Sequence, residues 1–188
     1  MRHRSHSTAM RHEPAPNLAS TVTRARAGDH AAIRALIELY HGRVGRFVRS
    51  MLTDDSEWED VAQTTFVKMI LGIERLQSVE IFESWLFKIA RNSSLDHLRR
   101  RKWRRIFIPW EPRHAEVAIH NHEDGRLAQV ERALTRLTVE QRELILLMRE
   151  SDWSYGDLGR ITGASAGAVK SRLFRARGRL RALMNGDE

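Results

Sequence analysis

The amino-acid sequence predicts an all-α protein of two small helical domains joined by a flexible linker, the C-terminal domain being a helix-turn-helix. Apolar residues recur at spacings of three and four in several segments, as they do along one face of a helix. No segment shows the apolar-polar alternation of a strand. A proline-containing stretch without periodicity separates two groups of helical segments. We expect a tail over 1–22, domains over 23–105 and 126–185, and a linker over 106–125.

The N-terminal domain is predicted to contain three helices. Residues 1 to about 20 hold almost no large apolar side chain, so they cannot bury enough surface to offset the entropy of ordering, and we expect disorder there. The first helix is predicted by one apolar stripe: Ile33, Leu36, Ile37, Tyr40, Val44, Phe47, Val48 and Met51. The second is expected to begin at Ser56, because Ser56 and Glu59 have the spacing of a capping box. After a break near Gln77, the third helix is predicted to bury Phe82, Trp85, Leu86, Ile89 and Ala90.

The C-terminal domain carries two further capping-box patterns. Thr138 with Gln141 opens one predicted helix, and Ser154 with Asp157 opens a shorter one. Gly163 lies in the turn that follows, where a positive φ costs glycine little. A longer helix is expected from Ala166, with this inward face: Val169, Leu173, Ala176 and Leu180.

The charge distribution indicates a polyanionic partner. The net charge is +8 and the isoelectric point about 10.8, which favours nucleic acid or an anionic membrane. Basic residues cluster between 99 and 105 and between 160 and 181, and no acidic residue occurs from Leu158 to Gly186. The acidic block between Asp54 and Asp60 suggests a second surface with another partner. Membrane-surface binding is disfavoured because the basic helices have small-residue faces committed to packing.

Several functions are excluded or disfavoured by what the sequence lacks. Without cysteine there is no disulfide, cysteine nucleophile or thiolate metal site. No phosphate-binding glycine loop or nucleophile elbow occurs, so we expect neither an enzyme nor a cofactor. His114, His120 and His122 lie in the predicted linker without fixed geometry, and we expect no metal site there. No apolar run reaches the roughly 20 residues that span a bilayer, so we expect a cytoplasmic protein without stable membrane insertion.

The helix from Ala166 is predicted to lie in the major groove of DNA. In a helix-turn-helix, side chains near the start of the second helix contact base edges, and surrounding cations bind phosphates. The predicted contacts are Lys170, Ser171, Arg172, Phe174, Arg175 and Arg177. Lysine or arginine can donate to guanine, whereas Phe174 could only pack on a thymine methyl or a sugar. The alternative is a solvated basic helix in a purely structural bundle.

Three separated motifs resemble those of extracytoplasmic-function (ECF) sigma factors, and the resemblance covers about residues 25 to 184. The segment 155–159 followed by 167–177 resembles the promoter-reading region of that family. Residues 60–66 resemble the helix that binds core polymerase, and 82–86, 89–92, Asp96 and Arg99 resemble the promoter-melting segment. Gly156 and Gly159 depart from the glutamate and alanine common in the family, and we expect each to weaken its short helix by about 0.5 to 1 kcal/mol. Ala168 replaces a common threonine, which removes a possible phosphate contact.

The resemblance implies a subunit of RNA polymerase that recognises promoter DNA. The C-terminal domain would bind the minus-thirty-five element and the N-terminal domain would open the minus-ten element. The implied minus-ten and melting residues are Gln77, Ser78, Val79, Trp85, Arg91, Asn92, Arg99 and Arg100. Core polymerase would contact Asp60, Gln63 and Phe66, the last expected to lie off the buried stripe. The family also implies an anti-sigma protein as a partner.

Three alternatives to these roles remain open. Trp85 lies on the apolar stripe and could serve core packing alone. The Asp60 helix could be an ordinary solvated face with acidic residues at its start. The whole chain could be a stand-alone helix-turn-helix regulator whose N-terminal helices dimerise or sense a signal; this alternative predicts tight DNA binding without polymerase.

Overall fold

The computed structural model describes residues 17–53, 56–107 and 125–186, and within these ranges the chain is helical with no β-strand. The first group of helices comprises α1 (Leu18–Arg26), α2 (His30–Leu52), α3 (Trp58–Gly72) and α4 (Phe82–Phe107), with the 3₁₀ turn η1 (Ile73–Arg75) after α3. The second group comprises α5 (Gly125–Thr135), α6 (Val139–Glu150), α7 (Tyr155–Thr162) and α8 (Ala166–Asn185). The predicted all-α class is confirmed.

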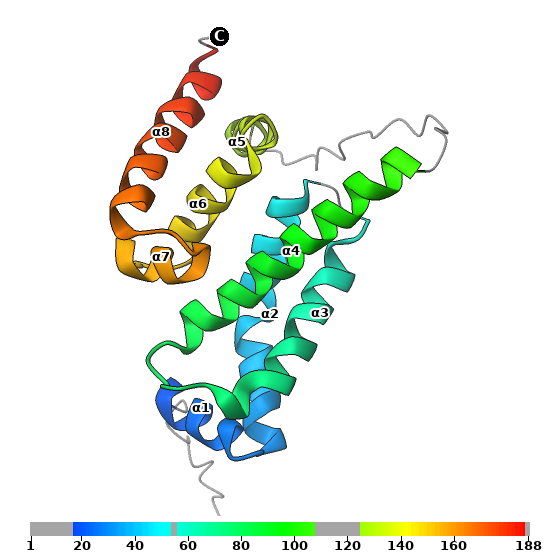
Figure 1. The fold of residues 1–188 in the computed structure, drawn as a ribbon, viewed down its shortest axis with the longest axis vertical. Coiled ribbons are helices and arrows are strands. Elements are labelled where there is room, and N and C mark those ends of the chain that lie inside the picture. Colours follow the sequence, from blue (N-terminus) through cyan, green and yellow to red (C-terminus); the bar gives the residue numbers. More distant parts are fainter. Residues whose placement is uncertain (1–16, 54–55, 108–124, 187–188) are drawn as a thin grey trace, which may run out of the picture.

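Helices α2, α3 and α4 form an up-down-up bundle, and α1 packs across the start of α2 (Figure 1). Asp29 caps α2 by accepting hydrogen bonds from the amides of Ala31 and Ala32 at 2.8 and 3.2 Å. The predicted stripe of α2 is buried at most of its positions, from Leu36 to Met51. Aromatic contacts tie the bundle together, including the edge-on pair of Tyr40 and Phe82 with ring centroids 5.5 Å apart.

Two expectations about this domain are wrong. The tail was expected over 1–22, but α1 begins at Leu18 and buries Thr21 and Val22, so ordered structure starts earlier; residues 1–16 lie outside the described residues. Ser56 does not open a capping box, because α3 begins at Trp58 with Glu57 at its N-cap and no side-chain cap bond. The Glu57 carboxylate instead lies 2.6 Å from Nε2 of His97 on α4.

The segment between the two groups of helices is largely outside the described residues. α4 continues to Phe107 and α5 begins at Gly125, so the expected linker overlaps both helix ends. Residues 108–124 are not described, and the linker histidines lie among them.

The C-terminal domain confirms both capping boxes. The Thr138 hydroxyl accepts from the Gln141 amide at 3.2 Å, and the Thr138 amide donates to the Gln141 side chain at 3.2 Å. Ser154 and Asp157 make the same reciprocal pair at 3.2 and 3.0 Å. Gly163 has φ of +75° at the end of α7, as expected for the turn of a helix-turn-helix. The turn sets the angle at which α8 leaves α7.

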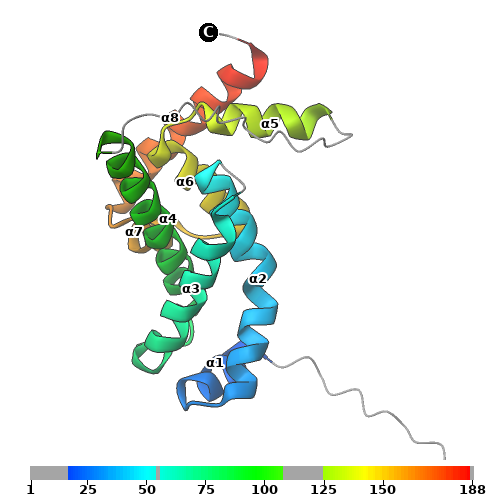
Figure 2. The same ribbon diagram turned by 90° about the vertical axis from the view of Figure 1, so that its right-hand side faces the viewer.

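The two domains pack against each other through α6 and α7. α6 lies along α2, and α7 lies beside α4 (Figures 1 and 2). Phe87 of α4 is fully buried between the domains, with its ring centroid 5.6 Å from that of Phe47 and 5.1 Å from that of Trp153. The two halves therefore share one continuous apolar core.

The two glycines of α7 differ in their surroundings. A Cβ on Gly159 would lie 2.6 Å from the carbonyl oxygen of Ala164 in the turn. A Cβ atom does not come this close to a backbone oxygen in folded proteins. A Cβ on Gly156 would lie 3.5 Å from the Ser154 hydroxyl, an ordinary contact. The expectation that both glycines merely weaken the helix is therefore incomplete, because Gly159 allows the close approach of helix and turn.

We predict opposite effects for alanine at these two positions. Gly156→Ala should raise the free energy of unfolding by about 0.5 to 1 kcal/mol, because alanine is the better helix former and has room. Gly159→Ala should lower it by about 1 to 3 kcal/mol, because the turn must shift. Chemical denaturation of the two variants measures both values. Equal changes of the same sign would contradict the packing described for Gly159.

A second prediction concerns the pH dependence of the α7 cap. Hydrogen bonds from Ser154 and Arg160 hold the pKa of Asp157 below its ordinary value of 3.8. The ionised carboxylate therefore stabilises the fold above that value, and the stabilisation is lost as the pH falls through the lowered pKa. Asp157→Asn should cost about 1 kcal/mol at neutral pH. Thermal unfolding followed by circular dichroism should show this difference shrinking below about pH 4; a pH-independent difference would argue against the charged cap.

Candidate nucleic-acid interface

Helix α8 is fixed by its apolar face and turns the opposite face outward. Val169, Leu173 and Ala176 are buried, and the helix packs on α5, α6 and α7 (Figure 1). Ser165 caps its start by accepting from the Ala168 amide at 3.2 Å. Leu180, expected to be buried, is only partly so. This packing decides which residues of α8 a ligand can reach.

Every residue of α8 predicted to contact DNA is exposed. Lys170, Ser171 and Arg175 lie near the start of the helix on the outward face, and Phe174 beside them is 80% exposed. Arg172 and Arg177 lie on the flanks of this face and are exposed as well. The surface thus combines cations, a hydroxyl and one aromatic ring, which are the groups that bind phosphates and base edges.

The predicted minus-ten residues are divided between exposed and packed positions. Gln77, Asn92, Arg99 and Arg100 are exposed, whereas the following residues of the loop before α4 are partly buried: Ser78 and Val79. The Ser78 hydroxyl donates to the carboxylate of Glu80, and the Val79 side chain packs on the core. Arg99 pairs with Asp96 at 2.9 Å.

Trp85 packs within the domain. Its indole would lie 3.1 Å from a Cβ placed on Gly72, and its ring centroid is 6.2 Å from that of Phe82. Trp85 is partly buried, so these contacts favour the packing alternative and place the ring as a support between the end of α3 and the start of α4.

Arg91 lies in an ion pair between the domains. Its Nε donates to one carboxylate oxygen of Glu143 on α6 at 2.7 Å, and Nη2 donates to the other at 3.2 Å. The two side chains are 16% and 4% exposed. Burial raises the pKa of Glu143, while the hydrogen bonds and charge of Arg91 and the charge of Arg172 oppose that rise. Asn92 accepts a 3.3 Å hydrogen bond from Arg91 but is itself exposed.

The outward face of α3 is polar at its start and apolar further on. Asp60 and Gln63 are exposed, as the predicted polymerase contacts require. The expectation that Phe66 lies off the buried stripe is wrong: it is 7% exposed and stacks on His41 with ring centroids 6.3 Å apart. Three exposed apolar side chains of α3 were not predicted from the sequence: Val67 at 48%, Ile70 at 41% and Leu71 at 76% exposed. They follow Gln63 by four, seven and eight residues, the spacing of one helical face, which could have shown a second stripe.

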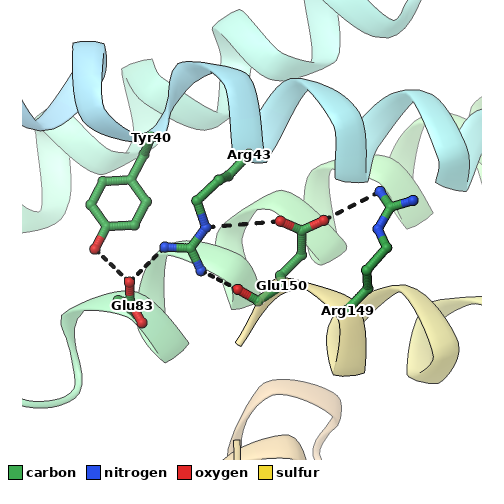
Figure 3. Close-up of polar contacts among 5 residues, drawn as sticks. All are labelled: Tyr40, Arg43, Glu83, Arg149 and Glu150. Atoms are coloured by element: carbon green, nitrogen blue, oxygen red, sulfur yellow. Dashed lines mark hydrogen bonds and ion pairs between the residues drawn. The ribbon is translucent and has the colours of Figure 1, made fainter. Parts of the chain in front are cut away.

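A polar network that the sequence did not predict joins the two domains (Figure 3). Arg43 of α2 donates to the Glu83 carboxylate at 2.7 Å and to the carbonyl oxygen of Glu150 at 2.5 Å. Tyr40 donates to the same Glu83 carboxylate at 2.7 Å. Burial, with Glu83 acting in the same direction, raises the pKa of Tyr40 well above its usual range, so the phenol remains a donor. Periodicity alone cannot reveal such contacts, because the partners are up to 107 positions apart.

Arg142 is a buried arginine that binds four backbone carbonyl groups. It donates to the carbonyl oxygens of Leu134 and Thr135 at the end of α5 and of Leu137 just after it, at 2.8 to 3.1 Å. It also donates to the carbonyl oxygen of Met51 on α2 at 2.9 Å. Burial lowers the pKa of Arg142 from its ordinary value. The residue therefore caps two helices from different domains.

Neither a metal site nor a membrane span emerges from the part of the chain that the structure describes. No group of three or more potential ligand side chains gathers within 17–53, 56–107 and 125–186. Over the same residues no helix combines the length and apolar character needed to cross a bilayer.

Comparison with known proteins agrees with this geometry. Residues 36–104 match the model of sigma-70 region 2, and residues 127–180 match the model of sigma-70, region 4. The probable RNA polymerase sigma-C factor of Mycobacterium bovis is 32% identical over 86% of this chain and 88% of its own length. The ECF RNA polymerase sigma factor SigM of Mycobacterium tuberculosis is 32% identical over 84% of this chain and 80% of its own.

Solved structures show the same similarity. The sigma factor RpoE of Bartonella quintana, in complex with the anti-sigma factor NepR, has a TM-score of 0.71 at 30% identity, covering 82% of this chain and 98% of that one. CnrH, in complex with the cytosolic domain of CnrY, has a TM-score of 0.69 at 25% identity, covering 92% of this chain and 100% of that one.

The region 2 match argues against a stand-alone regulator, because it assigns the N-terminal helices to a sigma domain and not to dimerisation or sensing. The chain belongs to the sigma-70 family and is an alternative sigma factor of the ECF group, which directs transcription.

Proposed function

We propose that each domain of this sigma factor has a distinct contact surface: α8 reads the minus-thirty-five element, α4 with the loop before it engages the minus-ten element, and the outward face of α3 docks on core RNA polymerase. The exposed, acid-free face of α8, held by a capped helix-turn-helix, is the observation that carries this proposal. The face is basic, and the major groove of DNA accepts an α-helix.

Base contacts on α8 are assigned to residues on the outward face of its first half. Lys170 and Arg175 supply donors for guanine or phosphate, and Phe174 supplies apolar contact for a thymine methyl or a sugar. Arg172 and Arg177 on the flanks serve the phosphates. The basic residues supply the salt-dependent part of the affinity.

The minus-ten surface uses the exposed members of its set. Gln77 in the loop and Asn92 on α4 have polar side chains open to an extruded base. Arg99 and Arg100 lie about two turns further along α4, where they can bind the DNA backbone. Trp85 acts through packing, by keeping the loop in place against the end of α3.

The polymerase-docking surface combines Asp60 and Gln63 with the apolar residues Val67, Ile70 and Leu71 on one face of α3. Exposed apolar side chains bordered by polar ones are typical of a protein-protein interface. An acidic start and an apolar continuation fit an amphipathic partner helix that carries basic residues.

The remaining roles follow from the family. The chain acts without catalysis, alongside RNA polymerase in the cytoplasm, and an anti-sigma protein restrains it. Two structural relatives, CnrH and RpoE, are each described in complex with another protein, and the partner of RpoE is named as an anti-sigma factor. These complexes support the proposal of an anti-sigma partner here.

We predict that Arg175→Ala weakens promoter binding by the reconstituted holoenzyme by about 10- to 100-fold, the effect of losing one good base contact. Arg181→Ala is the matched control, because it removes an exposed arginine from the far end of the same helix. We expect less than about a threefold loss there. Gel-shift titration at fixed salt measures both. Equal losses would show that α8 contributes charge without reading bases.

We predict that Asp60→Ala combined with Gln63→Ala lowers the affinity for core polymerase at least about tenfold, as expected for truncating central interface contacts. Glu38→Ala is the control, because it removes an exposed carboxylate from α2. Fluorescence anisotropy with labelled chain and purified core gives the dissociation constants. Undiminished affinity of the double variant would remove α3 from the docking surface.

A further inference from the structure

We propose that Trp103, near the end of α4, stacks on an exposed base of the promoter at the border between paired and melted DNA. The exposed ring, the cations around it and the helix face on which it lies are features of the chain itself. That the base belongs to promoter DNA rests on the proposed function of α4. Trp103 lies outside the three motifs that resemble those of ECF sigma factors.

Trp103 is a large apolar side chain that the fold leaves open to solvent. It is 60% exposed. No residue of α4 between Leu98 and Arg104 belongs to the apolar core, and Figure 1 shows this end of the helix extending past α3. A single exposed apolar side chain is common on protein surfaces. The surroundings of Trp103 are therefore what point to a ligand.

The surroundings of Trp103 are basic. Four exposed cations lie within four positions of it: Arg99, Arg100, Lys102 and Arg104. Asp96, which lies further back on the helix, is paired with Arg99 at 2.9 Å, so the carboxylate is partly neutralised. Nucleic acid combines phosphates that attract cations with flat base faces that stack on aromatic rings. A ring set among cations fits this ligand on both counts.

Trp103 shares one face of α4 with the residues proposed for the minus-ten element. The residues of this stripe follow one another at four, three and four positions: Asn92, Asp96, Arg99 and Trp103. Eleven residues of helix place Trp103 about 16 Å from Asn92 along the axis. That length equals about five stacked base steps of about 3.4 Å each. One strand that runs along this face can therefore reach both residues.

Stacking at this distance from Asn92 would stabilise the melted state of the promoter. When base pairs separate, the last pair of the remaining duplex loses its stacking neighbour on one side. An indole ring placed there covers the exposed base face. This contact exists only after melting, whereas the cations can bind phosphates before and after it. Trp103 should therefore favour opening, and the cations should favour binding in both states.

Two forms of promoter DNA separate these contributions in a binding assay with the reconstituted holoenzyme. One is a closed duplex, and the other is a fork junction whose minus-ten strand is unpaired. Trp103→Ala should weaken binding to the fork junction about tenfold, the effect of losing one stacked base. It should change binding to the closed duplex by less than about threefold, because no base face is exposed there. Trp103→Phe should retain most of the affinity, because a phenyl ring also stacks.

Arg104→Ala is the matched control, because it removes the exposed neighbouring side chain and one positive charge. It should weaken binding to both DNA forms alike. It should also reduce the slope of log affinity against log salt concentration by about one, as expected for one lost phosphate contact. Trp103→Ala should leave that slope unchanged.

Abasic sites introduced one at a time into the fork junction locate the stacked base. At one position the abasic site should weaken binding by the unsubstituted holoenzyme about tenfold. At that position it should cause no further loss in Trp103→Ala, because ring and base act as one pair. We expect this position about five steps from the one at which Asn92→Ala shows the same behaviour.

Three results would overturn the proposal. The first is equal affinity of Trp103→Ala and the unsubstituted holoenzyme for the fork junction. The second is an equal loss on both DNA forms, which would indicate packing in a groove. The third is a lower thermal stability of the free Trp103→Ala chain that accounts for the lost affinity, because the ring would then serve the fold.

A holoenzyme that binds neither DNA form would instead contradict the proposed function. Fluorescence of the free chain then decides whether Trp103 stacks on bases. The difference in tryptophan emission between the unsubstituted chain and Trp103→Phe isolates the emission of Trp103. Quenching of this difference by a single-stranded oligonucleotide would support stacking, and an unchanged difference would overturn it.

Discussion

The burial of a single apolar face by each short helix is the constraint on which the rest of this structure depends. Val169, Leu173 and Ala176 commit one side of α8 to packing, so Lys170, Phe174 and Arg175 must face outward. The same division on α3 leaves Asp60 and Gln63 exposed. Core packing thus determines which residues of α3 and α8 face outward, and the charge and polarity of each outward face then determine what it can bind.

The same burial of apolar faces operates at the interface between the two domains. Phe87 and Trp153 join apolar faces from different domains, while Arg43, Arg91 and Arg142 satisfy carboxylates and carbonyl groups at the same interface. The polar contacts give the interface its register, and their desolvation cost limits its stability.

Contacts between residues close together in the sequence were predictable, and contacts between residues far apart in it were not. The capping boxes at Thr138 and Ser154 were predictable because both partners lie within four residues. The same pattern failed at Ser56, because α3 begins at Trp58 and the neighbouring Glu57 is engaged by His97, 40 positions away. The spacing of the apolar residues of α8 correctly indicated its exposed face. Neither spacing nor family resemblance could show that Arg91 pairs with Glu143 or that Phe66 is buried, because both depend on how helices pack in three dimensions.

The central claim is that this chain gives core RNA polymerase its promoter specificity. The most direct test is transcription in vitro with purified core polymerase and a library of randomised promoters, with start sites mapped by sequencing of the transcripts. The account predicts that adding the chain produces new, reproducible start sites, each preceded by two conserved elements at a fixed spacing. The same distribution of start sites with and without the chain would contradict it.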